Sequence, residues 1–140
     1  MPDNHHTLQC VVVTPEQVLL NEAVDFVALP MYDGELGVLP GRAPLIGRLG
    51  YGELRTRKGT VTRHFYVDGG FAQVRDNTVT ILTPRAQRAE EINAEAASIA
   101  LQQAKAPAAT PEAQEGQTRA QARARSQLRI AHRLQGDGHA

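Results

Sequence analysis

Side chains that could catalyse a reaction are few in this chain of 140 residues. Only one of five histidines, His64, falls in a predicted strand, where we expect it to face outward. A metal centre in a sandwich needs at least two histidines and a carboxylate that converge, and a single histidine in a strand does not meet this requirement. A small metal enzyme is therefore only our third alternative. Cys10 has no evident activating histidine, and we expect it to be buried. The only serines, Ser98 and Ser126, lie in alanine-rich segments. We predict no catalytic residue, no metal ligand and no cofactor.

A segment rich in glycine and proline, GELGVLPGRAPL at residues 34–45, is the most distinctive motif. Glycine permits positive φ or a close approach of the backbone, and proline excludes a helix. The segment lacks the lysine and hydroxyl of a phosphate-binding loop, and no helical period follows it. The residue types alone therefore predict a rigid, shaped loop without a nucleotide site.

Five arginines and no acidic residue occupy residues 119–133. They form i,i+4 rows in which like charges repel, as in a solvated helix face or a surface kept for an acidic partner. The chain has no net charge and no aromatic residues among these arginines, which argues against nucleic-acid binding in general. We prefer contact with an acidic protein. A stand-alone β-sandwich that binds anions or nucleic acid through this helix is the main alternative.

The composition changes near residue 84. Residues 1–84 hold 26 Leu, Ile, Val and Phe residues, whereas residues 85–140 hold 6 of these and 16 alanines. Valine favours strands and alanine favours helices. The sequence therefore predicts an α+β protein: an antiparallel β-sandwich domain at residues 1–84, then a tail of two antiparallel helices at residues 85–140.

Alternating apolar residues and turn signals locate the strands. We expect strands at 8–13, 17–20, 24–29, 61–67, 71–75 and 78–82, the last two joined by a hairpin turn at Asp76-Asn77. Enough large apolar residues are present for one small core. We expect this domain to fold alone.

Capping signals locate the helices of the tail. Thr83 and Pro84 predict a helix from 84 to 104, which Ala106-Pro107 ends. Thr118 and Gln121 fit a capping box that opens a second helix, ending near Gly136. The expected facing stripes are Ala89, Ile92, Ala96 and Ile99 on the first helix, and Ala120, Ala124, Leu128 and Ala131 on the second.

Such a hairpin is expected to be weakly packed. A buried alanine methyl contributes about 0.8 kcal/mol, whereas ordering one residue costs about 1.5 kcal/mol. We therefore expect a tail that lies on its own sandwich or extends along another protein.

No apolar run reaches the length of about 20 residues that a membrane helix needs. The start of the sequence does not resemble a signal peptide, so we expect a cytoplasmic protein without direct membrane insertion.

Four stretches occur in a fixed order: TPE from Thr14, VDFVALP ending at Pro30, DGELGVLPGRAPL from Asp33, and VDGGFAQVRDNTVTIL from Val67. With the two-helix tail that follows, this order resembles the epsilon subunit of bacterial and chloroplast F-type ATP synthases. The resemblance spans nearly the whole chain. The third and fourth stretches together are its most specific part.

The resemblance implies a ten-stranded sandwich at the foot of the central stalk of a rotary ATP synthase. Such a subunit is non-catalytic and helps couple ion flow to ATP synthesis. It would bind the gamma subunit, rest on the membrane ring of c subunits, and lie at the cytoplasmic face of the bacterial plasma membrane. Glu35 would meet the polar loops of the ring, and Asp33 and Gly34 would shape that contact.

The resemblance also implies a role for the tail. In an extended state, its basic side chains would approach the acidic loop of the catalytic beta subunits within the alpha and beta assembly, and would block ATP hydrolysis. The candidate residues for this inhibitory contact are Arg119, Arg123, Arg125 and Arg129.

Two departures from the family pattern concern chemistry. Arg42 stands where the family usually has histidine. Many members bind ATP through an I/L-D-x-x-R-A motif, and here the matching residues 92–97 read INAEAA. The cation that would pair with phosphate is thus replaced by Ala96, so we expect no nucleotide-binding site.

Overall fold

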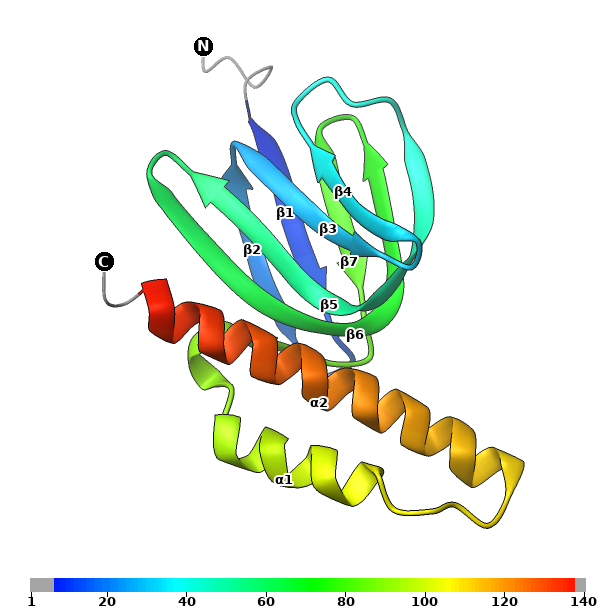
Figure 1. Cartoon of the computed structure of the whole chain (residues 1–140). Coiled ribbons are helices and arrows are strands. Elements are labelled where there is room, and N and C mark those ends of the chain that lie inside the picture. The colour runs from blue at the N-terminus through cyan, green and yellow to red at the C-terminus, as the bar shows by residue number, and fades with distance from the viewer. Residues whose placement is uncertain (1–6, 138–140) are drawn as a thin grey trace. The chain divides into compact units, whose positions relative to one another are not determined.

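The computed structural model describes residues 7–137 of the chain, with side chains as far as residue 134 (Figure 1). It divides into a first compact unit that extends to Ala86 and a second that begins at Gln87. The strands are β1 Leu8–Val13, β2 Val18–Val24, β3 Phe26–Met31, β4 Gly34–Val38, β5 Leu45–Lys58, β6 Val61–Arg75, β7 Thr78–Leu82 and β8 Ala86–Arg88.

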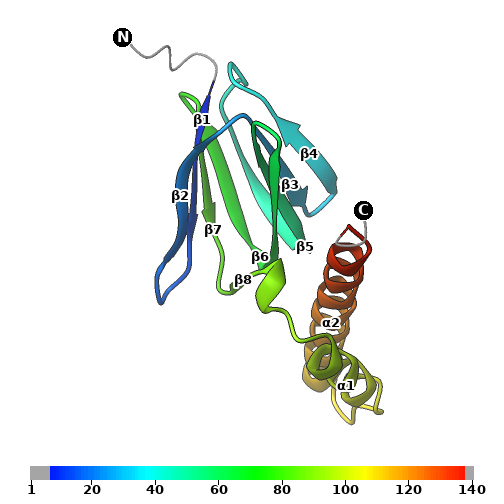
Figure 2. The same ribbon diagram turned by 90° about the vertical axis from the view of Figure 1, so that its left-hand side faces the viewer.

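One hydrogen-bonded path joins the strands in the order β2-β1-β7-β6-β5-β3-β4, and β8 pairs with β6. The path curves into the two layers of a sandwich, as Figure 2 shows. Five neighbouring pairs are antiparallel, namely β1–β2, β3–β4, β3–β5, β5–β6 and β6–β7. The predicted antiparallel sandwich is thereby confirmed, with one exception that the sequence did not predict: β1 and β7 pair in parallel. Parallel neighbours need a long connection, and here most of the sandwich lies between them.

β5 and β6 form a long curved ribbon that keeps a single register, from Leu45 opposite Val74 to Lys58 opposite Val61. Its bend lies at Gly69 and Gly70, whose φ angles are 76° and 102°. A side chain on Gly70 would collide with the backbone of Leu82. The described residues therefore form eight strands, not the ten that the resemblance implied, because pairing continues through the bend. The expected strands 61–67 and 71–75 are likewise parts of the single strand β6.

The core of the first unit is built by alternation, since successive side chains of a strand point to opposite faces. Leu8, Cys10 and Val12 of β1 are buried, as are Val79 and Ile81 of β7. Both strands lie where the sequence predicted them. The expected strands 17–20 and 24–29 are found slightly later, as β2 and β3.

The predicted hairpin turn between β6 and β7 is confirmed. Asp76 and Asn77 have φ angles of 51° and 59°, the left-handed conformation that this type of two-residue turn needs at both positions. The glycine-rich segment differs from the expected loop, because residues 34–38 form β4 beside β3. Gly34 and Gly41 have the positive φ that was expected, at 134° and 88°. Gly37 serves close approach, since a Cβ there would lie 3.1 Å from the Phe26 ring.

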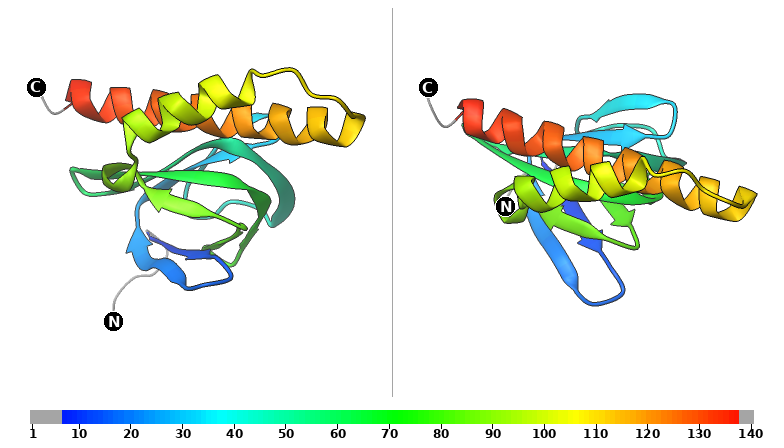
Figure 3. Two further views of the ribbon diagram at one scale, coloured as in Figure 1. Left: turned by 90° about the horizontal axis from the view of Figure 1, so that it is seen from below. Right: turned by 60° about the horizontal axis from the view of Figure 1, so that its bottom comes forward.

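The second unit contains a short 3₁₀ helix, Ala89–Glu91, then α1 Ala94–Ala104 and α2 Pro111–Asp137. α1 and α2 form an antiparallel hairpin, as the sequence predicted (Figure 3). The first helix does not start at Pro84. Thr83 is buried, and its hydroxyl donates to the Arg85 carbonyl at 3.0 Å instead of capping a helix. The N-cap is Asn93, whose side chain accepts from the Ala96 N–H at 2.9 Å. The helix ends just before Ala106-Pro107, as expected.

α2 begins seven residues before the predicted capping box, at the signal Thr110-Pro111. The Thr110 hydroxyl accepts from the Ala113 N–H at 3.1 Å, and Pro111 occupies the first helical position, where its missing N–H costs nothing. Thr118 lies inside the helix and donates to the Gln114 carbonyl at 2.9 Å. Gln121 donates to the Ala104 carbonyl at 2.8 Å and so satisfies the C-terminal end of α1. The helix and its type of cap are as predicted, but the predicted start at Thr118 is wrong, because Thr110 is the residue that caps α2.

The facing stripe on α2 is confirmed in part, since Ala124 and Ala131 are buried. The stripe predicted for α1 is wrong. Ala96 is exposed and Ile99 is 52% exposed, whereas Ala97 and Ala104 are buried one heptad apart. Because α1 starts later than expected, Ala89 and Ile92 precede it and do not extend its apolar face.

Candidate functional site

The tight turn between β3 and β4 holds the three residues predicted to contact a rotor ring. Tyr32 and Asp33 form the turn, and Met31 pairs with Gly34 across it. Gly34 takes a φ of 134°, which a residue with a side chain rarely adopts. Asp33, Gly34 and Glu35 are all exposed. The structure therefore presents these three residues together at one end of the sandwich.

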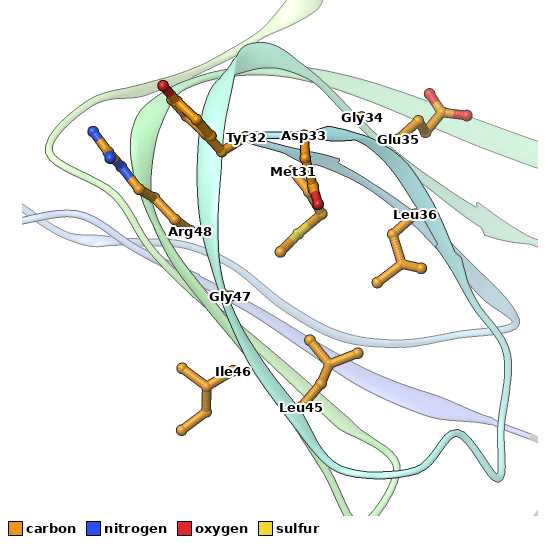
Figure 4. Close-up of a pocket in the computed structure, with 10 residues that line it drawn as sticks. All are labelled: Met31, Tyr32, Asp33, Gly34, Glu35, Leu36, Leu45, Ile46, Gly47 and Arg48. Carbon is orange, nitrogen blue, oxygen red and sulfur yellow. The ribbon is translucent and has the colours of Figure 1, made fainter.

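A pocket of about 590 Å³ opens beside this turn (Figure 4). Met31, Leu36 and Leu45 provide apolar lining. In Figure 4 the Asp33 side chain extends among the residues that line the pocket, whereas the Glu35 carboxylate is turned away from it.

A charged cluster on the outer face of β5 and β6 engages Glu35. Its carboxylate accepts from Arg55 at 2.7 Å. The Arg55 Nε lies 3.7 Å from Glu53, and Glu53 lies 3.4 Å from His64 Nδ1, a contact that is an ion pair only when the histidine is protonated. His64 lies on the face opposite the buried Phe65, as the sequence predicted, yet its side chain is only 16% exposed.

An apolar row crosses the outer face of the sheet, and the register of four strands defines it. Phe71 of β6 pairs with Leu82 of β7, Leu82 with Val13 of β1, and Val13 with Val18 of β2. Phe71, Leu82 and Val18 are 58%, 52% and 57% exposed. A groove of about 460 Å³ runs beside Phe71 and Leu82, with Pro15 and Pro84 in its lining. Exposed apolar surface of this kind marks an interaction site.

Sequence reasoning missed this apolar row. The available signal was an apolar residue at a position where alternation requires a polar one, such as Leu82 directly after the buried Ile81. Each such residue is ordinary by itself. Only the strand order brings the four of them into one line.

The tail arginines lie on α2, but not on one face. Arg119, Arg125 and Arg129 are exposed, whereas Arg123 is half-buried. An α-helix turns about 100° per residue, so Arg119 and Arg125 lie about 120° apart around the axis. The four candidates form two pairs, 119 with 123 and 125 with 129. A single flat acidic surface would therefore not meet all four at once.

The other residues considered for chemistry, Cys10 and the position of the ATP motif, lie in surroundings that explain them by structure. Burial, and in second place the Glu22 carboxylate, raises the pKa of the Cys10 thiol from 9.0 to about 12, so the thiol stays protonated. Within residues 7–137, no three His, Cys, Asp or Glu side chains are placed to hold a metal ion. At the position of the ATP motif, Asn93 caps α1 and Ala96 offers no cation. None of the described helices is long and apolar enough to cross a membrane.

Comparison with known proteins identifies the family. Residues 7–89 match the family model "ATP synthase, Delta/Epsilon chain, beta-sandwich domain". The ATP synthase epsilon chain of Rhodopirellula baltica is 50% identical over 126 residues, which cover 89% of this chain and 98% of that one. The epsilon chain of Solibacter usitatus is 45% identical, covering 79% of this chain and 81% of that one.

A solved structure agrees with these relatives. A chain in the Euglena gracilis mitochondrial ATP synthase assembly of OSCP, F1 and c-ring superposes with a TM-score of 0.70 and 27% identity. The superposition covers 94% of this chain and 81% of that one. The resemblance stated from sequence motifs is thereby confirmed. The chain belongs to the ATP synthase epsilon chain family.

Proposed function

We propose that this chain is the non-catalytic subunit that links the gamma subunit of the central stalk to the ring of c subunits in a rotary ATP synthase. It helps couple ion flow to ATP synthesis while the catalytic sites lie on other subunits. In a bacterial cell, this assignment places it at the cytoplasmic face of the plasma membrane. The observation that carries the proposal is the apolar row, because a subunit that is fixed to a partner needs an exposed apolar surface that the partner can cover.

The apolar row is assigned to the gamma subunit. Phe71 is the exposed aromatic residue of the row, and aromatic anchors dominate the energetics of interfaces. Replacing both Phe71 and Leu82 by Ser should remove two anchors and weaken binding by about 2 kcal/mol or more. Val61, which is 56% exposed at the start of β6 and outside the row, provides the matched control as Val61→Ser.

A pull-down with the gamma subunit tests the proposal. The full chain should retain gamma, the Phe71→Ser, Leu82→Ser double variant should lose it, and Val61→Ser should retain it. Salt-dependent binding to nucleic acid without gamma would instead support a stand-alone anion-binding protein.

The turn of Asp33, Gly34 and Glu35 is assigned to the polar loops of the c ring. Its exposure and its acidic character support contact with basic side chains, which salt should weaken. The tail is assigned an inhibitory contact with the acidic loop of the beta subunits through Arg119, Arg123, Arg125 and Arg129. Three of these side chains are exposed and can meet a partner.

Charge reversal tests the inhibitory contact. Replacing the four arginines by Glu should raise ATP hydrolysis of the reconstituted complex, because acidic surfaces would then repel the tail. Because the arginines form two pairs, each pair should be reversed separately as well. Unchanged hydrolysis in all three variants would refute the assignment.

A further inference from the structure

The two carboxylates of the β3–β4 turn differ in their surroundings. Glu35 is bound to Arg55, whose Nη2 lies 2.7 Å from Glu35 Oε1. Within residues 7–137, Asp33 has no ion pair or side-chain hydrogen bond, and it is exposed. One acid of the turn is therefore ion-paired within the chain, and the other has no such partner among the described residues.

The strand register explains why Arg55 reaches Glu35. Arg55 of β5 lies opposite Ala28 of β3, and Ala28 lies opposite Gly37 of β4. Glu35 stands two residues from Gly37 and so points to the same face of the sheet. Glu35 itself lies opposite Pro30 of β3. Neither Ala28 nor Gly37 carries a side chain long enough to stand between the arginine and the glutamate. The arginine spans β3 to bind the Glu35 carboxylate, which is turned away from the pocket in Figure 4.

Arg55 is itself held in place from a second side. Glu53 lies on the same face of β5, and its side chain is only 10% exposed at 3.7 Å from the Arg55 Nε. The Arg55 Nε makes no hydrogen bond there, so Glu53 attracts the guanidinium only through its charge, whereas Glu35 binds it directly. This attraction favours a position of Arg55 near β5.

The pocket beside the turn fits a long basic side chain. Its apolar lining can cover the aliphatic stem of a lysine or arginine, whose charged head would then meet Asp33. Arg48 also lines the pocket, but its guanidinium lies over the Tyr32 ring, 4.6 Å from the centroid, and is turned away from Asp33 in Figure 4. The carboxylate that faces the pocket is thus left without a cation.

We infer that Arg55 is a positioning residue that withdraws Glu35 from the contact, so that Asp33 is the carboxylate that binds a basic side chain of the rotor ring. This inference rests on the proposed function, because it names the chemistry of the ring contact. It reverses the roles that the resemblance implied for these two acids.

Binding of the full chain to a purified assembly of gamma and the c ring tests the inference. Asp33→Asn should weaken binding about fivefold at low salt and reduce its salt dependence, the upper range for an exposed ion pair. Glu35→Gln should change binding less than twofold. Glu95→Gln, which removes an exposed carboxylate from α1, provides the matched control and should have no effect.

Arg55→Gln separates positioning from a merely structural role. Releasing Glu35 adds a free carboxylate beside the pocket, so binding should be kept or strengthened. In that background, Glu35→Gln should then weaken binding several-fold. The inference would be overturned if Glu35→Gln alone weakened binding as much as Asp33→Asn does. It would also be overturned if Glu35→Gln had the same effect on binding with and without Arg55→Gln.

A measurement on the isolated chain keeps the inference independent of the ring. In carboxyl ¹³C NMR, Arg55→Gln should move the Glu35 resonance and leave that of Asp33 in place. An unchanged Glu35 resonance would overturn the positioning role. Failure of the wild-type chain to bind the gamma and c-ring assembly would instead count against the proposed function, so the two failures are distinguishable.

Discussion

The two units of this chain are stabilised in different ways. The first unit buries a continuous core of large side chains, including Leu29, Leu54, Phe65 and Ile81. The second buries mostly alanines, with Ile130 as its one large buried residue within the described part of the chain. A fully buried large apolar side chain contributes about 1.5–3 kcal/mol, whereas an alanine methyl contributes about 0.8 kcal/mol. Packing therefore specifies the first unit much more strongly than the second.

Polar contacts partly offset the weak packing of the second unit. Asn93 and Thr110 cap the two helices, and Gln121 joins them at 2.8 Å from the Ala104 carbonyl. A side-chain bond of 2.8 Å between Gln127 and Gln87 ties α2 to the segment before α1. Each such bond contributes about 1 kcal/mol and can be exchanged for water. This contrast agrees with our proposals for the two units. We call the sandwich the mount, because it is assigned to gamma and the c ring, and the tail the arm, because its weak packing lets it leave one contact and make the inhibitory one.

The largest effect is expected from Phe65→Ala in the sandwich core. Phe65 is 1% exposed, and loss of a buried phenylalanine costs about 3–5 kcal/mol. All three tyrosines lie in the first unit, so tyrosine fluorescence reports its unfolding, while circular dichroism at 222 nm follows the helices. The tyrosine transition in urea should move strongly to lower concentration. Ile99→Ala, an exposed site on α1, should leave it unchanged.

A second large effect should arise at the bend of the β5–β6 ribbon. Gly70→Ala places a side chain at a φ of 102° and against the Leu82 backbone. The resulting strain should destabilise the folded first unit by about 1–3 kcal/mol or more. Because Leu82 belongs to the apolar row, binding to gamma should weaken as well. Gly50→Ala is the control, since its Cβ would meet its nearest atom at 3.4 Å. Equal stability of both variants would refute the role of this bend.

A smaller effect, confined to the second unit, is expected from Asn93→Ala. Loss of an N-cap costs about 0.5–2 kcal/mol, and here it should reduce the stability of α1 only. Hydrogen exchange of the α1 amides should accelerate, while the β1 and β7 amides keep their protection. Asn93→Asp, which retains the capping acceptor, should preserve the helix. Accelerated exchange in both units would show that they unfold together.

The smallest effect at neutral pH concerns Cys10, whose pKa burial raises to about 12. Below pH 9 the thiol is protonated in both the folded and the unfolded chain. Between pH 9 and 12 it ionises only when unfolded, so stability should fall as pH rises through this window. Urea denaturation at pH 8 and at about pH 10.5 should show this fall in the wild type and less of it in Cys10→Ala. Iodoacetamide should label the folded chain slowly at pH 8; rapid labelling would contradict burial.

Local signals in the sequence predicted much of the fold. The alternation in residues 8–13 and the turn at Asp76-Asn77 depend on neighbouring residues, so they can be read without the rest of the chain. The parallel pairing of β1 with β7 depends on a connection of more than sixty residues and has no local signal. The start of α2 was missed because Thr110-Pro111 and Thr118 both carry capping chemistry, and tertiary packing decides between them.

The candidate site was predictable only where its residues are neighbours in sequence. Asp33, Gly34 and Glu35 could be grouped because they follow one another in a turn. The ion pair of Glu35 with Arg55 spans twenty residues and depends on β3 lying between β4 and β5. The apolar row likewise needs the order of four strands. Strand order, which patterns of single residues do not encode, is therefore what the sequence left open.

The most direct test of the mount-and-arm account is ATP turnover by the reconstituted complex, with the full chain or with a chain that ends at Ala86. The account predicts that the shortened chain still binds gamma and sustains ATP synthesis driven by an ion gradient, while ATP hydrolysis rises. A shortened chain that binds gamma but leaves hydrolysis unchanged, or one that cannot support synthesis, would contradict it.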